Sequence, residues 1–368
     1  METTNRVSEI LKQQDADWAV LTGPDSVCYA TGHIVGIEIG PTPFSGGPTT
    51  AFVSRDGAVG VVCPNVEAGC VPNGVESEIY VGFACSVTDQ IKNYNAAVRR
   101  MIERLGIKGD FAVEQAGFTA ALAELLPGNT VPIDMPLARA RAVKTAPELE
   151  KLRYSAQVAA AGQEAARKIS LSGISEVEAL AHIRGVMERM AGERCALAGE
   201  YVSGVDRTSQ LGTPPGAQVI GNGDPIVCDL APRVNGYWGD SCGSFIVGTA
   251  MPEAYEPMFD TAFAALQLAI SEIRPGLRID TLDGIIRAFM EKQGYSYPHH
   301  TGHGIGTSVH EFPRIVPDET STFEENMVMM VEPGSYVPGL GGLRVEYMLQ
   351  VTATGAEIMA PFKIDCHL

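Results

Sequence analysis

The sequence predicts an α+β protein of two domains: a smaller N-terminal α/β domain, and a larger C-terminal domain in which helices cover one face of a mainly antiparallel sheet. The 368 residues, 45% hydrophobic and 19% charged, are typical of a globular chain long enough for two domains. Alternating helical and extended patterns indicate the first domain, and two strand–turn–strand patterns that carry carboxylates indicate the second. We place the boundary near Lys144, giving domains 1–143 and 144–368.

The N-terminal domain alternates between helical and extended patterns. Apolar residues recur at helical spacing in three segments, at 7–14, 90–105 and 118–126. Short runs rich in β-branched and aromatic residues predict five strands, at 18–22, 50–54, 59–63, 110–114 and 130–133. The Gly- and Pro-rich stretch 36–49 predicts a loop, either a plain surface excursion or an element that contacts substrate.

Helix-start signals open the C-terminal domain. The tripeptide Thr-Ala-Pro at 145–147 predicts a long helix that ends at residue 169. Ser175, followed three residues later by Glu178, forms a capping box and predicts a second helix that ends at residue 190.

Two more helices are expected before the last strands. One covers 257–273 and is stopped by the Pro-Gly pair at 275–276. The other runs to Lys292 with Asp280 as its N-cap. The apolar residues of this second helix form one face: Leu282, Ile285, Ile286, Phe289 and Met290.

Asp229 and Asp240 flank a tight turn. A turn centred on 234–235 places Asp229 opposite Asp240, whereas a turn centred on 235–236 places Asp240 opposite Ala231. In either register both carboxylates lie on one face of the sheet, because side chains alternate with period two. Like charges in an apolar sheet repel each other and resist desolvation. A positive group must therefore lie between them, and a metal ion is the simplest candidate.

Three further candidate ligands follow in the chain. His303 lies in a Gly-flanked motif, Glu332 follows the apolar run MVMMV, and Glu346 follows the Gly-rich turn PGLGGLRV. A buried carboxylate without a partner costs several kcal/mol. Four carboxylates and one imidazole are more ligands than a single closed tetrahedral zinc site can take. They suit two divalent ions that share bridging carboxylates, with Mn, Co, Fe or Zn as possible metals.

The ordered set Asp, Asp, His, Glu, Glu resembles the pita-bread metallohydrolases, a superfamily that includes prolidase, Xaa-Pro aminopeptidase, methionine aminopeptidase and creatinase. The matching stretches are CDLAPRVNGYWGD, GHGIGTSVHEFPRI, VEPGSYVPGLGGLRVE and the linker ARAVKTAPELEKLRYS. The N-terminal part matches more weakly, through SVCYATG. The resemblance implies a C-terminal pita-bread catalytic domain with a curved sheet, and an N-terminal creatinase/prolidase-like domain.

The resemblance also implies how the metal ligands are shared. Asp240 and Glu346 would bridge two divalent ions, with manganese favoured. Asp229 would belong to one ion, and His303 and Glu332 would belong to the other.

The resemblance assigns chemical roles to residues around these ligands. Glu332 would also shuttle a proton from the attacking water, and His310, seven residues after His303, would stabilise the intermediate and contact substrate. Arg314, in HEFPRI, matches a position implicated in recognition of the substrate carboxylate. Arg344 is assigned to substrate binding as well.

Three departures from the family pattern affect substrate choice. The loop SGVDRTSQL places Leu211 where the family has a histidine, with Arg207 and Gln210 as candidate replacements. The stretch GDSCGS lacks the Thr and Arg that follow the second Asp, and RVEY places Tyr347 where the family has an Asp. Metal ligation survives these changes, whereas proline specificity depends on the altered surroundings.

These observations leave three functional hypotheses. The leading one is a dinuclear-metal Xaa-Pro dipeptidase or aminopeptidase that cleaves the amide bond of a small peptide by attack of metal-activated hydroxide. The second is a creatinase-like hydrolase of a non-peptide C–N bond in a small amidine or lactam. The third is a non-catalytic binding module. By resemblance, the chain is expected to form a homodimer.

Composition narrows the expected partners. The net charge of −17 disfavours nucleic acids and anionic membranes. No run approaches the roughly 18 consecutive apolar residues of a membrane helix, and the polar N-terminus lacks a signal-peptide core. We therefore predict a cytoplasmic enzyme with reduced thiols. Cys228 and Cys242, beside the aspartates, are interpreted as small buried hydrophobes.

Overall fold

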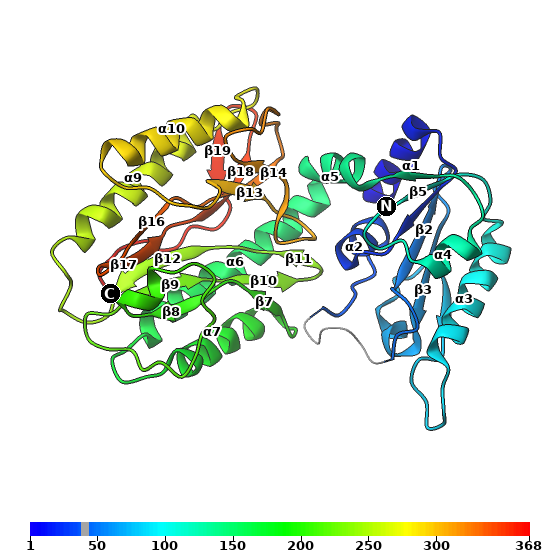
Figure 1. Cartoon of the computed structure of the whole chain (residues 1–368), viewed down its shortest axis with the longest axis horizontal. Coiled ribbons are helices and arrows are strands. Elements are labelled where there is room, and N and C mark those ends of the chain that lie inside the picture. The colour runs from blue at the N-terminus through cyan, green and yellow to red at the C-terminus, as the bar shows by residue number, and fades with distance from the viewer. Residues whose placement is uncertain (38–43) are drawn as a thin grey trace. The chain divides into compact units, whose positions relative to one another are not determined.

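The structure, a computed structural model, describes residues 1–37 and 44–368. The chain forms two compact units, Met1–Arg141 and Ala142–Leu368. Helices and sheets occur in both units, which confirms the α+β prediction (Figure 1). The loop predicted at 36–49 lies partly outside the described residues.

The N-terminal unit is built on one six-stranded mixed sheet. Its strands, in spatial order, are β4 (Glu76–Tyr80), β3 (Val59–Pro64), β2 (Thr50–Ser54), β1 (Trp18–Leu21), β5 (Phe111–Val113) and β6 (Thr130–Pro132). β1 pairs antiparallel with β2 and parallel with β5. Alternate residues of β1 enter two different hydrophobic cores, Ala19 and Leu21 in one, Trp18 and Val20 in the other. Both faces of the sheet are therefore covered.

Helices and the other strands supply the rest of these two cores. The helices are α1 (Glu2–Gln14), α2 (Pro24–Thr31), α3 (Gln90–Leu105), α4 (Ala120–Leu125) and α5 (Asp134–Ala142), with a 3-10 helix η1 (Asn65–Cys70) after β3. The predicted helices and strands of this unit are all present. α2, α5 and β4 were not predicted, and α1 begins five residues earlier than predicted, because its first turn is polar.

The C-terminal unit contains several small sheets whose named strand pairs are all antiparallel. One five-stranded sheet has the order β14 (Glu311–Ile315), β13 (Gly302–Gly304), β15 (Val328–Val331), β18 (Tyr347–Val351) and β19 (Ala356–Ile358). A three-stranded sheet has the order β11 (Tyr237–Trp238), β10 (Ala231–Val234) and β7 (Ala196–Ala198). A second three-stranded sheet has the order β12 (Cys242–Ile246), β9 (Pro225–Asp229) and β8 (Tyr201–Ser203). A hairpin of β16 (Gly334–Val337) and β17 (Gly341–Arg344) completes the unit.

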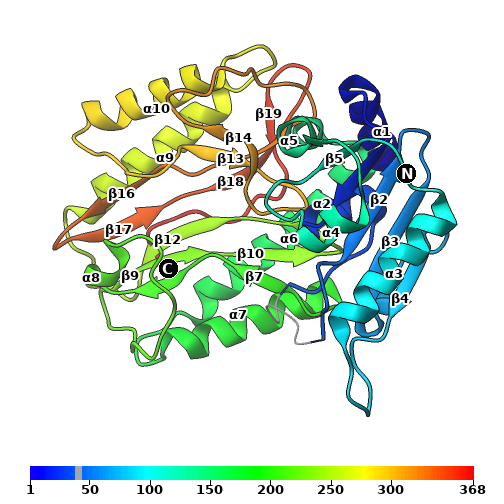
Figure 2. The same ribbon diagram turned by 45° about the vertical axis from the view of Figure 1, so that its right-hand side comes forward.

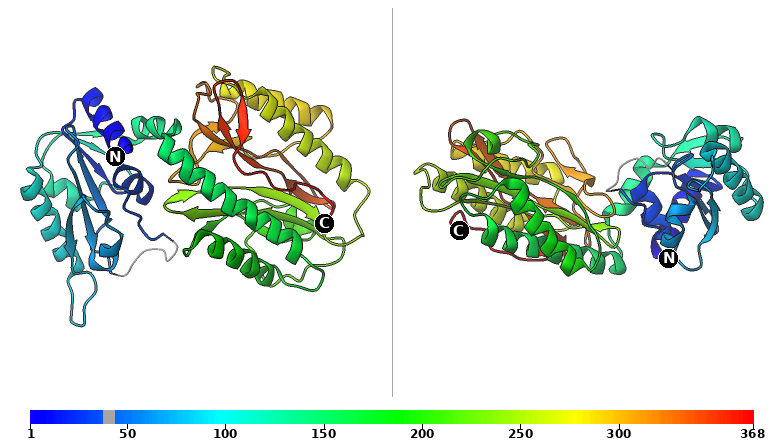
Figure 3. Two further views of the ribbon diagram at one scale, coloured as in Figure 1. Left: turned by 180° about the vertical axis from the view of Figure 1, so that it is seen from behind. Right: turned by 90° about the horizontal axis from the view of Figure 1, so that it is seen from below.

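Helices in the C-terminal unit pack in two pairs. α6 (Ala146–Ile169) and α7 (Glu176–Ala191) lie side by side, and α6 also packs on β10 and β11 (Figure 3). α9 (Tyr255–Glu272) and α10 (Ile279–Lys292) form the second pair (Figure 2), with the short α8 (Val205–Thr208) elsewhere in the unit. The predicted capping box of Ser175 with Glu178 is present, and Thr145 caps α6 as predicted, where it forms a further capping box with Glu148.

The predicted N-cap of α10 is wrong. The helix begins at Ile279, its N-cap is Arg278, and no side chain caps it. Asp280 instead lies in the first turn, where a carboxylate interacts favourably with the helix dipole, and Arg278 Nε donates to its Oδ1 at 3.1 Å. The predicted apolar face of α10 is confirmed, with Leu282 and Ile286 among its buried residues.

The hairpin between the two aspartates adopts the second of the two predicted registers. Val234 pairs with Tyr237, so the turn residues are Asn235 and Gly236, with φ angles of 50° and 80°. Positive φ at both turn positions is typical of a type I′ turn, which matches the twist of the strands. The same register continues to β9 and β12, where Asp229 pairs with Cys242.

Within the described residues, every helix is too short or too polar to cross a lipid bilayer.

Candidate metal centre

The four predicted carboxylate ligands come from the ends of strands or the links between them, and the histidine lies within a strand. Asp229 ends β9, Asp240 lies between β11 and β12, His303 is the middle residue of β13, Glu332 follows β15, and Glu346 lies between β17 and β18. Pairing brings these segments together: β13 lies beside β15, and the Glu346 N–H donates to the Cys242 carbonyl at 2.9 Å. The strand ends, rather than a flexible loop, therefore position the acidic groups.

Three of these side chains form a tight, buried group. Ligand atoms of Asp240, His303 and Glu346 all lie within 4.8 Å of one another. His303 Nε2 is 3.8 Å from Asp240 Oδ2 and 3.6 Å from Glu332 Oε1. Both distances exceed a normal hydrogen bond. Among the described residues, Glu346 Oε2 is buried without a hydrogen-bond partner. Cations coordinated between these atoms would satisfy them, so the residues fit a metal site.

The His303 ring is oriented as a metal ligand requires. Its Nδ1 is 2.8 Å from the Gly304 carbonyl oxygen, so Nδ1 carries the proton and donates it. The Nε2 lone pair is then left toward the carboxylates. Burial lowers the pKa of His303 to about 3, which keeps the ring neutral at neutral pH. A backbone carbonyl that fixes the tautomer in this way is common behind metal-binding histidines.

Negative charge is concentrated in this group. Burial raises the pKa of Asp240 well above its ordinary value, and Asp229 and Glu332 raise it further. Burial likewise raises the pKa of Glu346, with Asp240 as the next cause. These carboxyls resist ionisation because nothing among the described residues neutralises them fully. A divalent cation would remove this penalty.

Asp229 differs from the other carboxylates because an arginine contacts it. Arg344 Nη2 pairs with Asp229 Oδ2 and lies 3.0 Å from Glu200 Oε1, and Arg344 Nη1 donates to the Tyr336 hydroxyl at 2.9 Å. Burial raises the pKa of Asp229, and Arg344 opposes that shift. These contacts make Arg344, which is 5% exposed, a positioning residue behind Asp229. Its role in substrate binding remains a prediction.

Glu200 is an acidic residue of this site that the sequence analysis missed. Its backbone exchanges two hydrogen bonds with that of Asp229, at 3.0 and 2.7 Å. The preceding Gly199 has φ 99°, and a Cβ there would meet the Asp229 carbonyl oxygen at 2.4 Å. The Gly-Glu pair at 199–200 is the only local signal, and a glycine beside an acid is too common to predict this pairing.

Glu332 contacts a second missed residue, His300. His300 Nε2 is 2.8 Å from Glu332 Oε1, and Arg314 Nη2 is 2.6 Å from His300 Nδ1. A guanidinium only donates, so His300 Nδ1 accepts from Arg314, and the protonated Nε2 lies against Glu332 Oε1. Burial acts to raise the pKa of Glu332, but the neighbouring His300 and His303 rings and the Arg344 guanidinium outweigh it and lower that pKa to about 2. Glu332 is therefore ionised at neutral pH.

His310 and Arg314 lie where the group meets solvent. The His310 ring centroid is 4.1 Å from that of His303 and 5.6 Å from that of His300. Partial burial, and then the neighbouring His300, lower the pKa of His310, so its ring is neutral at neutral pH. His310 and Arg314 are both exposed. Both are accessible to a substrate.

Comparison with known proteins identifies the family. Residues 150–353 match the model of metallopeptidase family M24, and residues 4–143 match the creatinase/prolidase N-terminal domain. The chain belongs to metallopeptidase family M24. It is therefore a metallohydrolase, and membership implies divalent metal ions.

Relatives and solved structures match this M24 peptidase over nearly its whole length. A putative dipeptidase, YkvY, of Bacillus subtilis is 28% identical over 385 residues, covering 99% of both chains. The structure of prolidase from Pyrococcus horikoshii OT3 is similar with a TM-score of 0.81 and 21% identity, covering 100% of both chains. Xaa-Pro dipeptidase from Bacillus anthracis gives a TM-score of 0.81 at 23% identity, covering 100% of this chain and 99% of that one. These likenesses confirm the predicted pita-bread fold.

The structure also places the departures from the family pattern. Leu211 is 42% exposed. The two candidate replacements contact residues other than the candidate metal ligands. Arg207 pairs with Glu176, and Gln210 Nε2 donates to the Asp206 carbonyl. Tyr347 is buried, and its hydroxyl donates to the Phe362 carbonyl at 2.7 Å. Tyr347 therefore contributes to the core of the M24 peptidase.

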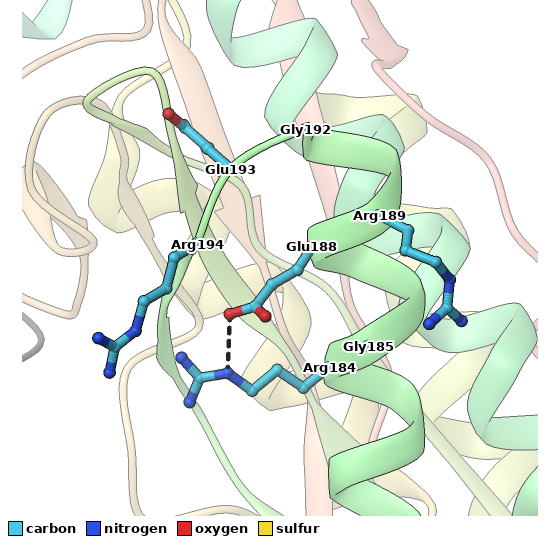
Figure 4. A pocket seen from close by; sticks show the side chains of 7 residues that line it. All are labelled: Arg184, Gly185, Glu188, Arg189, Gly192, Glu193 and Arg194. Atoms are coloured by element: carbon cyan, nitrogen blue, oxygen red, sulfur yellow. Dashed lines mark hydrogen bonds and ion pairs between the residues drawn. The ribbon is translucent and has the colours of Figure 1, made fainter.

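A surface hollow of about 680 Å³ at the C-terminal end of α7 is chemically different from the acidic group (Figure 4). Its lining includes three arginines, and Arg184 Nε donates to Glu188 Oε1 at 3.0 Å. Another lining residue, Glu193, accepts a hydrogen bond from the Asn235 N–H in the hairpin turn. Cations at a helix C-terminus are favoured by the helix dipole. This hollow contains none of the predicted site residues.

Proposed function

We propose that this M24 peptidase is a dipeptidase that hydrolyses Xaa-Pro dipeptides with two divalent cations, manganese being the first choice. The observation that carries the proposal is the buried group of Asp240, Glu346 and neutral His303, in which carboxylates lack sufficient positive partners. The Bacillus subtilis relative is named a putative dipeptidase, and the Bacillus anthracis structure is named an Xaa-Pro dipeptidase. Both names support small peptides as the substrate class.

The proposed ligand assignment follows the charges. Asp240 and Glu346 would hold both cations, as the family resemblance implies, and burial and neighbouring carboxylates raise the pKa values of both groups. Asp229 would bind one cation, and His303 and Glu332 the other. When bound, the cations would acidify a water molecule and polarise the scissile carbonyl.

Glu332 and His310 would carry the proton transfers. Glu332 is ionised and can take a proton from the attacking water. His300 Nε2 lies 2.8 Å from Glu332 Oε1, so Oε2 would hold the proton before it passes to the leaving nitrogen. The neutral His310 ring can donate an N–H to the carbonyl oxygen as negative charge develops on it.

Arg314 would recognise the C-terminal carboxylate of the dipeptide. Its guanidinium contacts His300, which in turn contacts Glu332, so a fixed positive charge lies two side chains from the proposed base. A planar guanidinium can bind a carboxylate through two parallel hydrogen bonds. The homodimer, the cytoplasmic location and the domain limits 1–143 and 144–368 remain predictions.

The test is a substrate panel on protein stripped of metal and reloaded with manganese. We expect two metal equivalents per chain and hydrolysis of Met-Pro and Gly-Pro, with little turnover of Met-Ala, the tripeptide Met-Pro-Gly or creatine. Asp240→Asn should lose metal and activity together. If the tripeptide were cleaved in preference to the dipeptides, the proposed activity would be that of an aminopeptidase and not of a dipeptidase. Turnover of amidines or lactams but not of peptides would overturn the proposal.

A further inference from the structure

A second group of side chains with metal-ligand chemistry lies within the N-terminal unit. One ring nitrogen of His33, Cys63 Sγ and a carboxylate oxygen of Glu67 lie within 4.8 Å of one another. His33 directly follows the C-cap of α2, Cys63 lies near the end of β3, and Glu67 lies in η1. Three separate segments of the unit therefore bring a nitrogen, a sulfur and an oxygen to one place.

His33 and Cys63 are fully buried, Glu67 is partly exposed, and one buried nitrogen of the group lacks a partner among the described residues. The side chain of His33 is 0% exposed and that of Glu67 is 15% exposed, with 3.3 Å between His33 Nε2 and Glu67 Oε2. Thr49 Oγ1 donates to the same Glu67 oxygen at 2.7 Å and orients the carboxylate. Among the described residues, His33 Nδ1 is buried without a hydrogen-bond partner.

A plain hydrogen-bonded pair explains only part of this arrangement. A His33–Glu67 contact accounts for Nε2 and for the carboxylate. It does not account for a fully buried thiol beside them or for the unpartnered Nδ1. A cation ligated by nitrogen, sulfur and oxygen would use all three groups at once.

We propose that His33, Cys63 and Glu67 bind one zinc-class divalent cation that fastens α2, β3 and η1 together. A thiolate and an imidazole select zinc over magnesium or calcium, which prefer oxygen ligands. One thiolate and one carboxylate neutralise the two positive charges of the cation. The fourth position is open to water or to the exposed thiol of Cys70, at the end of the same 3-10 turn. This site is independent of the proposed peptidase function.

Binding has to displace a proton from sulfur. Burial raises the pKa of the Cys63 thiol to about 12, with Glu67 as the next cause. The thiol is therefore protonated in the absence of a cation, as thiols of unoccupied zinc sites commonly are at neutral pH.

The test uses the full chain carrying Asp240→Asn and Glu346→Gln, which weaken the carboxylate centre. We expect this protein to retain one zinc per chain after dialysis. Cobalt in place of zinc should give a thiolate-to-cobalt absorption band. Adding Cys63→Ser should abolish the band and the retained zinc, whereas Cys195→Ser, at a buried cysteine of the other unit, should change neither.

Two further variants keep the test decisive. The Glu67→Gln variant should fold, because Glu67 is partly exposed. We expect it to bind zinc at least about tenfold more weakly, and this result does not depend on whether Cys63→Ser folds. Cys70→Ser weakens binding if Cys70 is the fourth ligand and leaves it unchanged if water is. A cobalt band that persists in Cys63→Ser, or zinc retention that is equal in the parent and Glu67→Gln, would overturn the proposal.

Discussion

Two buried glutamates of the C-terminal unit, Glu176 and Glu346, have opposite surroundings. Glu176 accepts hydrogen bonds on both oxygens: on Oε1 from the Ser203 N–H at 2.7 Å, and on Oε2 from Arg207 Nη2 and the Gly216 N–H, each at 2.8 Å. Glu346 Oε2 has no such partner among the described residues, and its neighbours include Asp240. Both side chains are at most 1% exposed.

The comparison distinguishes a carboxylate that stabilises the fold from a carboxylate that is suited to bind a cation. A buried carboxylate saturated by N–H groups and an arginine stabilises the segments that it joins. A buried carboxylate without sufficient donors destabilises the protein until a cation arrives. Substitutions at the two positions should therefore have opposite effects on stability and on activity.

The largest effect is expected for Glu346→Gln. A neutral amide cannot replace a bridging carboxylate, so we expect loss of bound metal and a drop in kcat/KM of about 10³-fold or more. The folded protein should persist, because like-charge repulsion is relieved. Metal analysis and dipeptide hydrolysis measure these outcomes. Full activity with two bound metals in this variant would remove Glu346 from the centre.

Glu176→Gln should give the reverse pattern. Replacing the buried Glu176, whose partner Arg207 is 32% exposed, should cost about 2 kcal/mol of unfolding free energy through lost charge-assisted hydrogen bonds, measured by urea denaturation. The specific activity of the folded fraction should change little. If this variant instead lost its metals while remaining as stable as the wild type, the contrast between the two glutamates would be wrong.

His310→Ala tests whether a residue beside His303 acts on the reaction rather than on metal binding. We expect both metals to remain and kcat to fall about 10²-fold, the size of effect seen when one donor to a developing oxyanion is removed. The control is His182→Ala, at an exposed position on α7. Loss of metal in the His310 variant would make that residue a ligand instead.

Arg314→Ala should have a smaller effect, confined to substrate binding. A lost charge-assisted hydrogen bond at an exposed position predicts a KM about tenfold higher with little change in kcat. The dipeptide amide Met-Pro-NH₂ has no C-terminal carboxylate and should not distinguish the variant from the wild type. Equal losses for both substrates would point to a structural role for Arg314.

The smallest expected effect is a pH dependence of the metal-free protein. The pKa values of Asp240 and Glu346 are raised in the folded state, so the folded chain binds more protons than the unfolded chain above about pH 4. With chelator present, the unfolding free energy should therefore fall by about 1 kcal/mol or more between about pH 5 and about pH 7. Glu346→Gln should flatten this slope. A wild-type slope of the opposite sign, relative to the variant, would contradict the proposed charge distribution.

Local patterns in the sequence predicted much of the fold. The Thr-Ala-Pro start, the Ser175 capping box and hydrophobic periodicity located α6, α7 and the apolar face of α10, because these signals act over a few residues. The Asp280 cap was misplaced because an acid in the first turn and an N-cap give similar sequence signals. Short elements such as α2 and β4 were missed because they depend on packing against distant strands.

The predicted site residues lie near one another, but their partners could not be predicted. His300 and Glu200 contact Glu332 and Arg344 through strand pairings that join segments far apart in the chain. The contact between Arg344 and Asp229 is also long-range, at a separation of 115 residues. No local pattern encodes such distances.

The sequence alone determined the two-part α+β architecture and the five candidate metal ligands, because periodicity, turn chemistry and the order of acidic residues are properties of neighbouring residues. Only the tertiary structure decided which carboxylates are saturated by protein donors, as Glu176 is, and which remain without them, as Glu346 does. The physical reason is that desolvation and hydrogen bonding depend on every segment that packs around a group, and those segments meet only in the folded chain.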